Sequence, residues 1–167
     1  VIGVLDARAH QPGLDHQVLF EDHVAIVIGQ GSKHWPHAER LGFADLQHEK
    51  WVMPPSGTLT RIQMDAFLIE QSASWLVPKA ETASLAMMQA LLHKGDYVGV
   101  CSESMADYMA SLGLFKKIAI GSSIRFGPIT VVWNREHVSA TLFDFVRCLV
   151  AHAPRAANVA NAATVAG

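Results

Sequence analysis

The 167-residue sequence is short of charge, cysteine and long apolar runs, and each shortage excludes a class of protein. Only 17% of residues are charged and half are hydrophobic, which favours a packed core over disorder. A net charge of −2 provides no basic surface for nucleic acid. Cys101 and Cys148 are too few for a disulfide framework and fit a reducing cytoplasm. No signal peptide or apolar run of about 18 residues is present, so we expect neither export nor a membrane span.

Catalytic and metal-binding motifs are also absent. The nine histidines include no H-E-x-x-H pair, and there is no C-x-x-C, no G-x-S-x-G and no phosphate-binding glycine pattern. His34 and His37 have ligand-like spacing but lie in a polar stretch that we interpret as a solvated loop. Cys101 ends an apolar strand and is expected to be a small core residue. The sequence therefore predicts no catalytic residue, no metal site and no cofactor.

Strand-like and helix-like segments alternate along the chain. This alternation predicts an α/β fold with a mainly parallel sheet. The expected strands cover residues 18–28, 50–53, 97–101, 114–120 and 129–133, with a polar loop at 29–40 and a final helix at 140–152. In the helix that begins near Leu59, apolar residues recur at steps of three and four. This stripe consists of Leu59, Ile62, Ala66, Ile69 and Ala73.

Two strand ends lead directly into helix starts that carry hydroxyl groups. In WVMPPSGTLTR, two prolines end the strand, Gly57 permits a tight turn, and Ser56 or Thr58 can cap the helix. The segment Glu81–Ser84 repeats this arrangement. Main-chain N–H groups at such helix starts suit a carboxylate, sulfonate or phosphate oxygen. The simpler alternative is that each Ser or Thr only caps its own helix.

The order of several short motifs resembles the effector-binding region of LysR-type transcriptional regulators. They extend over residues 1 to about 152, and their order is more specific than any single motif. The motifs are Ile2-Gly3, Pro12-Gly13-Leu14, Leu19-Phe20-Glu21-Asp22, Ala44-Asp45-Leu46, W-x-x-P-P-x-G-T from Trp51 to Thr58, Glu81-Thr82-Ala83-Ser84, Lys94 to Val100, and Gly127-Pro128-Ile129. Ser102 departs from the pattern, because the family usually has proline at this position.

The resemblance implies a type II periplasmic-binding-protein-like α/β fold, with one complete lobe plus part of a second lobe joined by two crossing strands. The remnant of the first lobe and the hinge strands would be residues 1–28 and 123–152. The second lobe would be 29–122, and 153–167 would be a flexible tail. Val1 lies inside a strand-like run without an initiator Met, so we expect a fragment that lacks the N-terminal winged helix-turn-helix and most of the first lobe.

The implied function is effector sensing by a cytoplasmic bacterial transcription regulator. Its partners would be a small anionic or aromatic metabolite, DNA through the absent N-terminal module, and further copies of itself. The helix SESMADYMASLG would offer an apolar face of Met105, Tyr108, Met109 and Leu112 to a partner subunit. The expected ligand-binding residues are Gly57, Thr58, Thr82, Ala83, Ser84, Phe126 and Gly127.

Two other functions remain open at this stage. A solute-binding receptor of a transport system has the same two-lobe fold, and a signal peptide upstream would distinguish it. A small α/β enzyme is disfavoured because no catalytic constellation is present, although turnover in a broad hydrolase and transferase screen would revive it.

Overall fold

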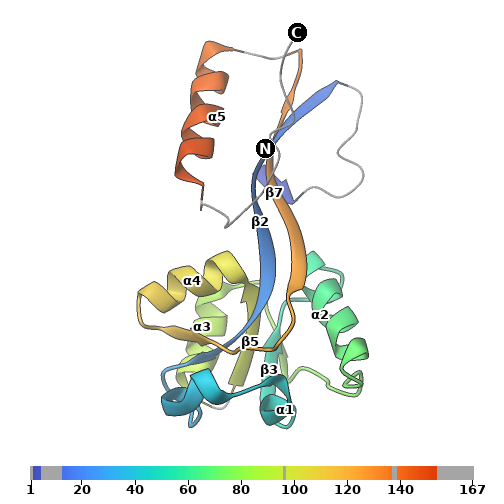
Figure 1. The fold of residues 1–167 in the computed structure, drawn as a ribbon, viewed down its shortest axis with the longest axis vertical. Helices are drawn as coiled ribbons and strands as arrows, with labels where there is room; N and C mark the ends of the chain where they lie inside the picture. The colour runs from blue at the N-terminus through green and yellow to red at the C-terminus, as the bar shows by residue number, and fades with distance from the viewer. Residues whose placement is uncertain (1, 5–12, 96, 137–138, 154–167) are drawn as a thin grey trace. The chain divides into compact units, whose positions relative to one another are not determined.

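A computed structural model describes residues 2–4, 13–95, 97–136 and 139–153 (Figure 1). The chain divides into two compact units, Val1–Glu21 with Gly127–Gly167, and Asp22–Phe126. The lobe boundaries expected from the resemblance remain a prediction, and the tail expected at 153–167 lies, apart from Ala153, outside the described residues. The elements are β1 Ile2–Val4, β2 Leu14–Gly29, the 3-10 helix η2 Trp35–Arg40, α1 Phe43–Leu46, β3 Lys50–Met53, α2 Leu59–Glu70, β4 Ala80–Glu81, α3 Leu85–His93, β5 Tyr97–Ser102, α4 Glu103–Ser111, β6 Phe115–Lys117, β7 Ile124–Asn134 and α5 Ala140–His152.

The sheet of the larger unit is mixed, so the expectation of a mainly parallel sheet was wrong. Strand β3 pairs in parallel with β4 and β5, whereas β2 pairs antiparallel with β5 and β6. Helical crossovers return the chain in the same direction, and they join β3, β4 and β5 through α2 and α3 and join β5 to β6 through α4. The alternation of strands and helices in the sequence does not show that β2 runs antiparallel to its neighbours.

Side chains alternate between the two faces of this sheet and form two cores. Ile26, Ile28 and Trp51 contribute to one core, which includes residues of α2. Val27 and Val52, next to them in sequence, contribute to the other core with residues of α3 and α4. Figure 1 shows α2 on one side of β3 and β5, and α3 and α4 on the other. The near-continuous apolar runs of β2, β3 and β5 therefore reflect a sheet that is buried on both faces.

Helix α2 buries a different face from the stripe predicted from its spacing. Its buried residues are Met64, Phe67 and Leu68, whereas Ile62 is 51% exposed and Ile69 is 67% exposed. Both sets of residues have helical spacing. The sheet is covered by the bulkier set, in which Phe67 packs edge-on against Phe43 with ring centroids 5.1 Å apart.

Three further elements differ from the sequence expectation. The stretch 29–40, expected to be a polar loop, contains η2, which has proline in its first turn. The strand expected at 114–120 is only β6, although the N–H of Ile118 still donates to the carbonyl oxygen of Ile26 at 2.9 Å. On α4, Met109 is buried at 3% exposure, while Tyr108 and Leu112 are exposed at 60% and 53%. The predicted apolar face of α4 is therefore reduced, because Met109 belongs to the core.

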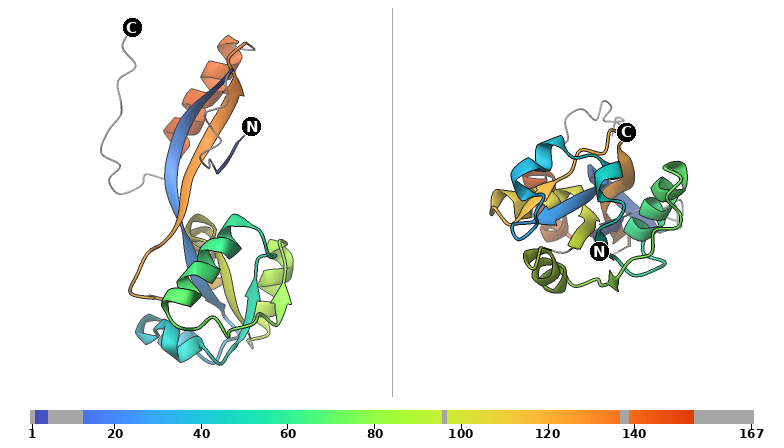
Figure 2. Two further views of the ribbon diagram at one scale, coloured as in Figure 1. Left: turned by 90° about the vertical axis from the view of Figure 1, so that its right-hand side faces the viewer. Right: turned by 90° about the horizontal axis from the view of Figure 1, so that it is seen from below.

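The smaller unit contains β1, α5 and parts of β2 and β7. Strand β1 pairs antiparallel with β7, and β7 is also the sheet neighbour of β2 (Figures 1 and 2). Helix α5 has the bounds predicted from the sequence; its Val146 is buried, while Phe145 is 52% exposed. The guanidinium of Arg135 lies 2.6 Å from the carboxylate of Asp15. None of the helices within the described residues is long and apolar enough to cross a membrane.

Candidate functional site

A cavity of about 310 Å³ lies where β3, β4 and β5 end in the larger unit. Because these three strands are parallel, their carboxyl ends share one edge of the sheet, and each leads into a helix. The edge where parallel strands end is the usual ligand site of open α/β sheets. The cavity is lined by Pro54, Pro55, Thr58, Thr60, Thr82, Ala83, Ser84, Leu85, Met88, Val100, Cys101, Ser102, Met105 and Phe126.

The start of α3 presents hydroxyl groups and free main-chain donors to this cavity. Ser84 is the N-cap residue, and its Oγ accepts a hydrogen bond from the N–H of Met87 at 3.3 Å. The Oγ1 of Thr82 accepts from the N–H of Ser84 at 3.0 Å. Each hydroxyl therefore acts as an acceptor for the main chain and retains its own O–H to donate. Among the described residues, no acceptor bonds to the N–H of Leu85 or Ala86.

The start of α2 is organised differently from the prediction that Ser56 or Thr58 caps it. Thr58 is the N-cap residue, but its hydroxyl makes no capping bond and instead donates to the carbonyl oxygen of Pro55 at 2.8 Å. The N–H of Thr58 donates to the same oxygen at 3.2 Å. Gly57 has φ of 83° and a Cβ there would contact nothing within 4 Å, so the tight turn explains this glycine.

At the start of α4, the chain supplies a negative group of its own. Ser102 is the N-cap residue and its Oγ accepts from the N–H of Met105 at 3.4 Å. The carboxylate of Asp22, only 4% exposed, accepts from the N–H and the Oγ of Ser104 at 3.1 and 2.7 Å. A contact between residues 82 positions apart gives no local sequence signal, so the predicted ligand-binding residues did not include Asp22.

An ion-paired arginine connects the first turn of α2 with the end of β4. Arg61 donates to Asp65 at 2.8 Å and to Glu81 at 2.6 Å, and only 13% of its side chain is exposed. The hydrogen bond from Arg61 lowers the pKa of the Glu81 carboxyl below its ordinary value. The spacing of Arg61 and Asp65 is a helical i,i+4 pair that the sequence could have indicated, whereas the contact with Glu81 depends on the sheet.

The cavity brings together five of the seven residues expected to bind a ligand. Thr58, Thr82, Ala83, Ser84 and Phe126 line it. Gly57 precedes Thr58 but is not among the lining residues, and Gly127 is the first residue of the C-terminal part of the smaller unit.

The wall formed by the end of β5 is apolar and uncharged. Burial, and secondly the charge of Asp22, raise the pKa of the Cys101 thiol to about 12, so this side chain stays neutral. No charged side chain is among the lining residues of the cavity. Ligand charge would therefore be met by main-chain N–H and hydroxyl groups.

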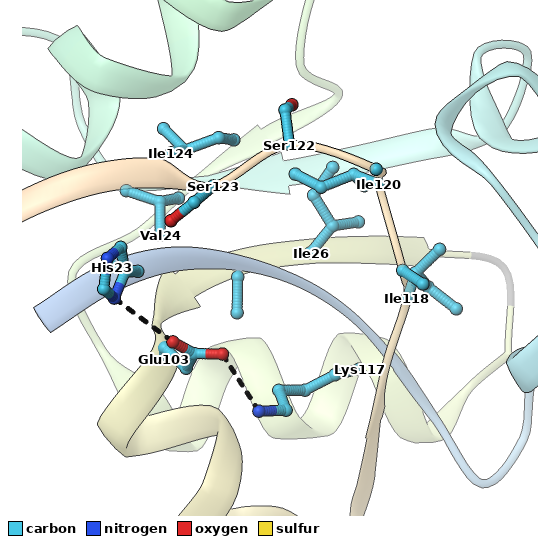
Figure 3. A pocket seen from close by; sticks show the side chains of 13 residues that line it. His23, Val24, Ile26, Glu103, Lys117, Ile118, Ile120, Ser122, Ser123 and Ile124 are labelled. Carbon is cyan, nitrogen blue, oxygen red and sulfur yellow. Dashed lines mark hydrogen bonds and ion pairs between the residues drawn. The ribbon is translucent and has the colours of Figure 1, made fainter. Parts of the chain in front are cut away.

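A second cavity, of about 450 Å³, lies beside β2 and the segment after β6 (Figure 3). Its polar side chains include Glu103, which pairs with His23 at 3.4 Å and with Lys117 at 3.0 Å. Lys117 also pairs with Asp107 at 2.6 Å. Because these charges already satisfy one another, the larger cavity offers less than the smaller one for recognising a charged ligand.

The histidines of the loop before α1 form no metal centre. His34 Nε2 lies 2.9 Å from a carboxylate oxygen of Glu49, which Lys33 also contacts at 2.8 Å. Within the described ranges, no three His, Cys, Asp or Glu side chains come close enough together to hold a metal ion. His34 thus has a structural partner rather than a ligand set.

The family model for the LysR substrate binding domain matches residues 2–154. Among solved structures, the CcmR regulatory domain of Synechocystis PCC6803 in complex with 2-PG is 13% identical, with a TM-score of 0.68 over 92% of this chain and 73% of that chain. The CrgA regulatory domain of Neisseria meningitidis is 16% identical, with a TM-score of 0.64 over 91% and 72%. Full-length CbnR complexed with its target DNA is 15% identical, with a TM-score of 0.64 over 92% and 51%. No curated protein matches the sequence.

Proposed function

The chain belongs to the family of LysR substrate-binding domains, and from this premise we propose which ligand it senses and where. A domain of this family senses a ligand in order to regulate transcription. We propose that its effector is a small organic anion with an apolar body, and that the cavity at the ends of β3, β4 and β5 holds it. The strongest support is the convergence of the α2 and α3 starts on one uncharged cavity.

The polar end of the cavity suits a carboxylate or phosphate oxygen. Neither α2 nor α3 has an acidic residue in its first turn, so the positive ends of their helix dipoles are not cancelled locally. The hydroxyls of Thr82 and Ser84 and the N–H groups of Leu85 and Ala86 add donors at the same place.

The remaining walls suit the apolar body of the ligand. Met88, Val100, Met105 and Phe126 contribute methylene, thioether and aromatic surface. Of the solved relatives, CcmR was determined with 2-PG, which makes 2-PG a reasonable member of a test panel. The composition of the cavity equally favours aromatic and aliphatic monocarboxylates.

The other partners of the intact regulator follow from the family. We propose that it is a cytoplasmic, homo-oligomeric regulator without catalytic activity. It would bind DNA through a winged helix-turn-helix that these residues do not include. Full-length CbnR was determined with its target DNA. The exposed Tyr108 and Leu112 of α4 are proposed to contact a partner subunit.

Filling the cavity tests the proposed site. In the full-length regulator, an effector is first identified with a panel of 2-PG and small carboxylates by calorimetry. Ala83→Trp places an indole in the cavity from an exposed position and should abolish effector binding and the effector-dependent change in DNA affinity. Met87→Trp, in the first turn of α3 and 54% exposed but outside the lining, is the control. Unchanged effector affinity in Ala83→Trp would place the site elsewhere.

A further inference from the structure

The two ends of the cavity differ in electrostatic character, and we propose that Asp22 makes one end reject negative charge. The α2 and α3 starts accept the anionic group of the ligand, while the end at Cys101 and Ser102 accepts only an uncharged group. Asp22 is then a specificity-determining residue that selects ligands with a single negative charge over diacids. This inference rests on the proposed function of the same cavity.

Asp22 occupies the position that an anionic ligand would take at a third helix start. Its Oδ1 accepts from the N–H of Ser104 at 3.1 Å and from the N–H of His23 at 2.9 Å, and its Oδ2 accepts from the Oγ of Ser104 at 2.7 Å. With 4% exposure, the carboxylate is held inside the unit and screened little by solvent. The first turn of α4 is therefore already neutralised by the chain itself.

A second carboxylate further distinguishes the start of α4 from the starts of α2 and α3. Glu103 lies in the first turn of α4, whereas the first turns of α2 and α3 contain no acidic residue. Glu103 is balanced by Lys117 and faces His23. Within the described part of the chain, Asp22 accepts hydrogen bonds from N–H and hydroxyl groups and pairs with no cationic side chain, so its charge is the one that a ligand would experience.

The charge of Asp22 acts on the residues that line the cavity. Cys101 lines it, and its thiol has a pKa raised by burial and by the coulombic effect of Asp22. Ser102, the next lining residue, caps the helix whose first turn Asp22 binds. A negative group of a ligand placed beside Cys101 would meet the same repulsion that disfavours the thiolate.

Ligand pairs that differ by one charge test this inference in the full-length regulator. Calorimetry would compare straight-chain monocarboxylates from butanoate to octanoate with the dicarboxylates of equal length. The wild type should prefer the monocarboxylate, and Asp22→Asn should reduce that preference about tenfold, the effect of one pKa unit of interaction. Ser104→Ala removes a hydrogen bond to Asp22 but keeps its charge, so its preference should equal that of the wild type. If Asp22→Asn acted only by loosening the packing, it would weaken the binding of monocarboxylates and dicarboxylates equally.

If Asp22→Asn does not fold, ligand binding to the wild type still tests the inference. The wild type should then bind the monomethyl ester of a diacid at least tenfold more tightly than the diacid, because the ester lacks the second charge. A diacid that binds as tightly as its ester, or an unchanged preference in Asp22→Asn, would overturn the role of Asp22 and leave the proposed function standing. If no member of either series binds, this inference fails, whereas the proposed function fails only if Ala83→Trp leaves the affinity for the identified effector unchanged.

Discussion

The hydroxyl of Ser84 has two roles that a single substitution can separate. It caps α3 by accepting from the N–H of Met87 at 3.3 Å, and in the proposed function it also donates to the effector. Loss of the cap should lower the free energy of unfolding by about 1 kcal/mol, or roughly 2–4 °C in melting temperature for a chain of this size. Loss of a hydrogen bond to a charged ligand should cost about 1.5–3 kcal/mol, roughly 10- to 150-fold in affinity. Ser84→Ala should therefore weaken both properties, measured by thermal denaturation and by calorimetry with the identified effector.

Ser139 provides a control with the same local geometry. It caps α5 by accepting from the N–H of Leu142 at 3.2 Å, and it lies outside the cavity. Ser139→Ala should show the loss of stability with no change in effector affinity. If Ser84→Ala behaves in the same way, the hydroxyl is only a cap, and the proposed contact with the effector is refuted.

Two further predictions concern the loops around the cavity and the packing of the unit. Gly95→Ala should destabilise the protein by at least about 2 kcal/mol in denaturant unfolding, because φ is 87° and a Cβ would lie 2.0 Å from the carbonyl oxygen of Gly31. Gly57→Ala has a similar φ but open space around the new Cβ, so it should cost only about 1 kcal/mol. Equal losses of stability in the two variants would contradict the packing argument. Arg61→Met should move the lowered pKa of the Glu81 carboxyl toward its ordinary value in an NMR titration, because the hydrogen bond and charge of Arg61 are the main causes of the lowering. The stabilisation from this pair is present above the ordinary Glu pKa and is lost as the pH falls through the lowered value, so an unshifted titration in the variant would show that Arg61 is not the cause.

The candidate site was only partly predictable from the sequence. Thr82, Ala83 and Ser84 were recognisable because a Ser or Thr between a strand end and an apolar helical run marks a helix start. Asp22, by contrast, acts on α4 from 82 positions away in sequence, and no local pattern announces such a contact. The direction of the Thr58 hydroxyl was also unpredictable, because a threonine at a helix start can accept from the helix or donate to the preceding turn, and here it donates to the carbonyl oxygen of Pro55.

The sequence by itself determined the family, the succession of strands and helices, and the positions of several helix ends. These features depend on local patterns: the bounds of β3 and α5, the cap at Ser84 and the left-handed Gly95 after α3 follow from short runs of residues. The tertiary structure decided which strands run antiparallel, which face of α2 is buried, and where the charges lie around the cavity. Those features depend on contacts between residues distant in sequence, whose energies outweigh local preference once the sheet has formed.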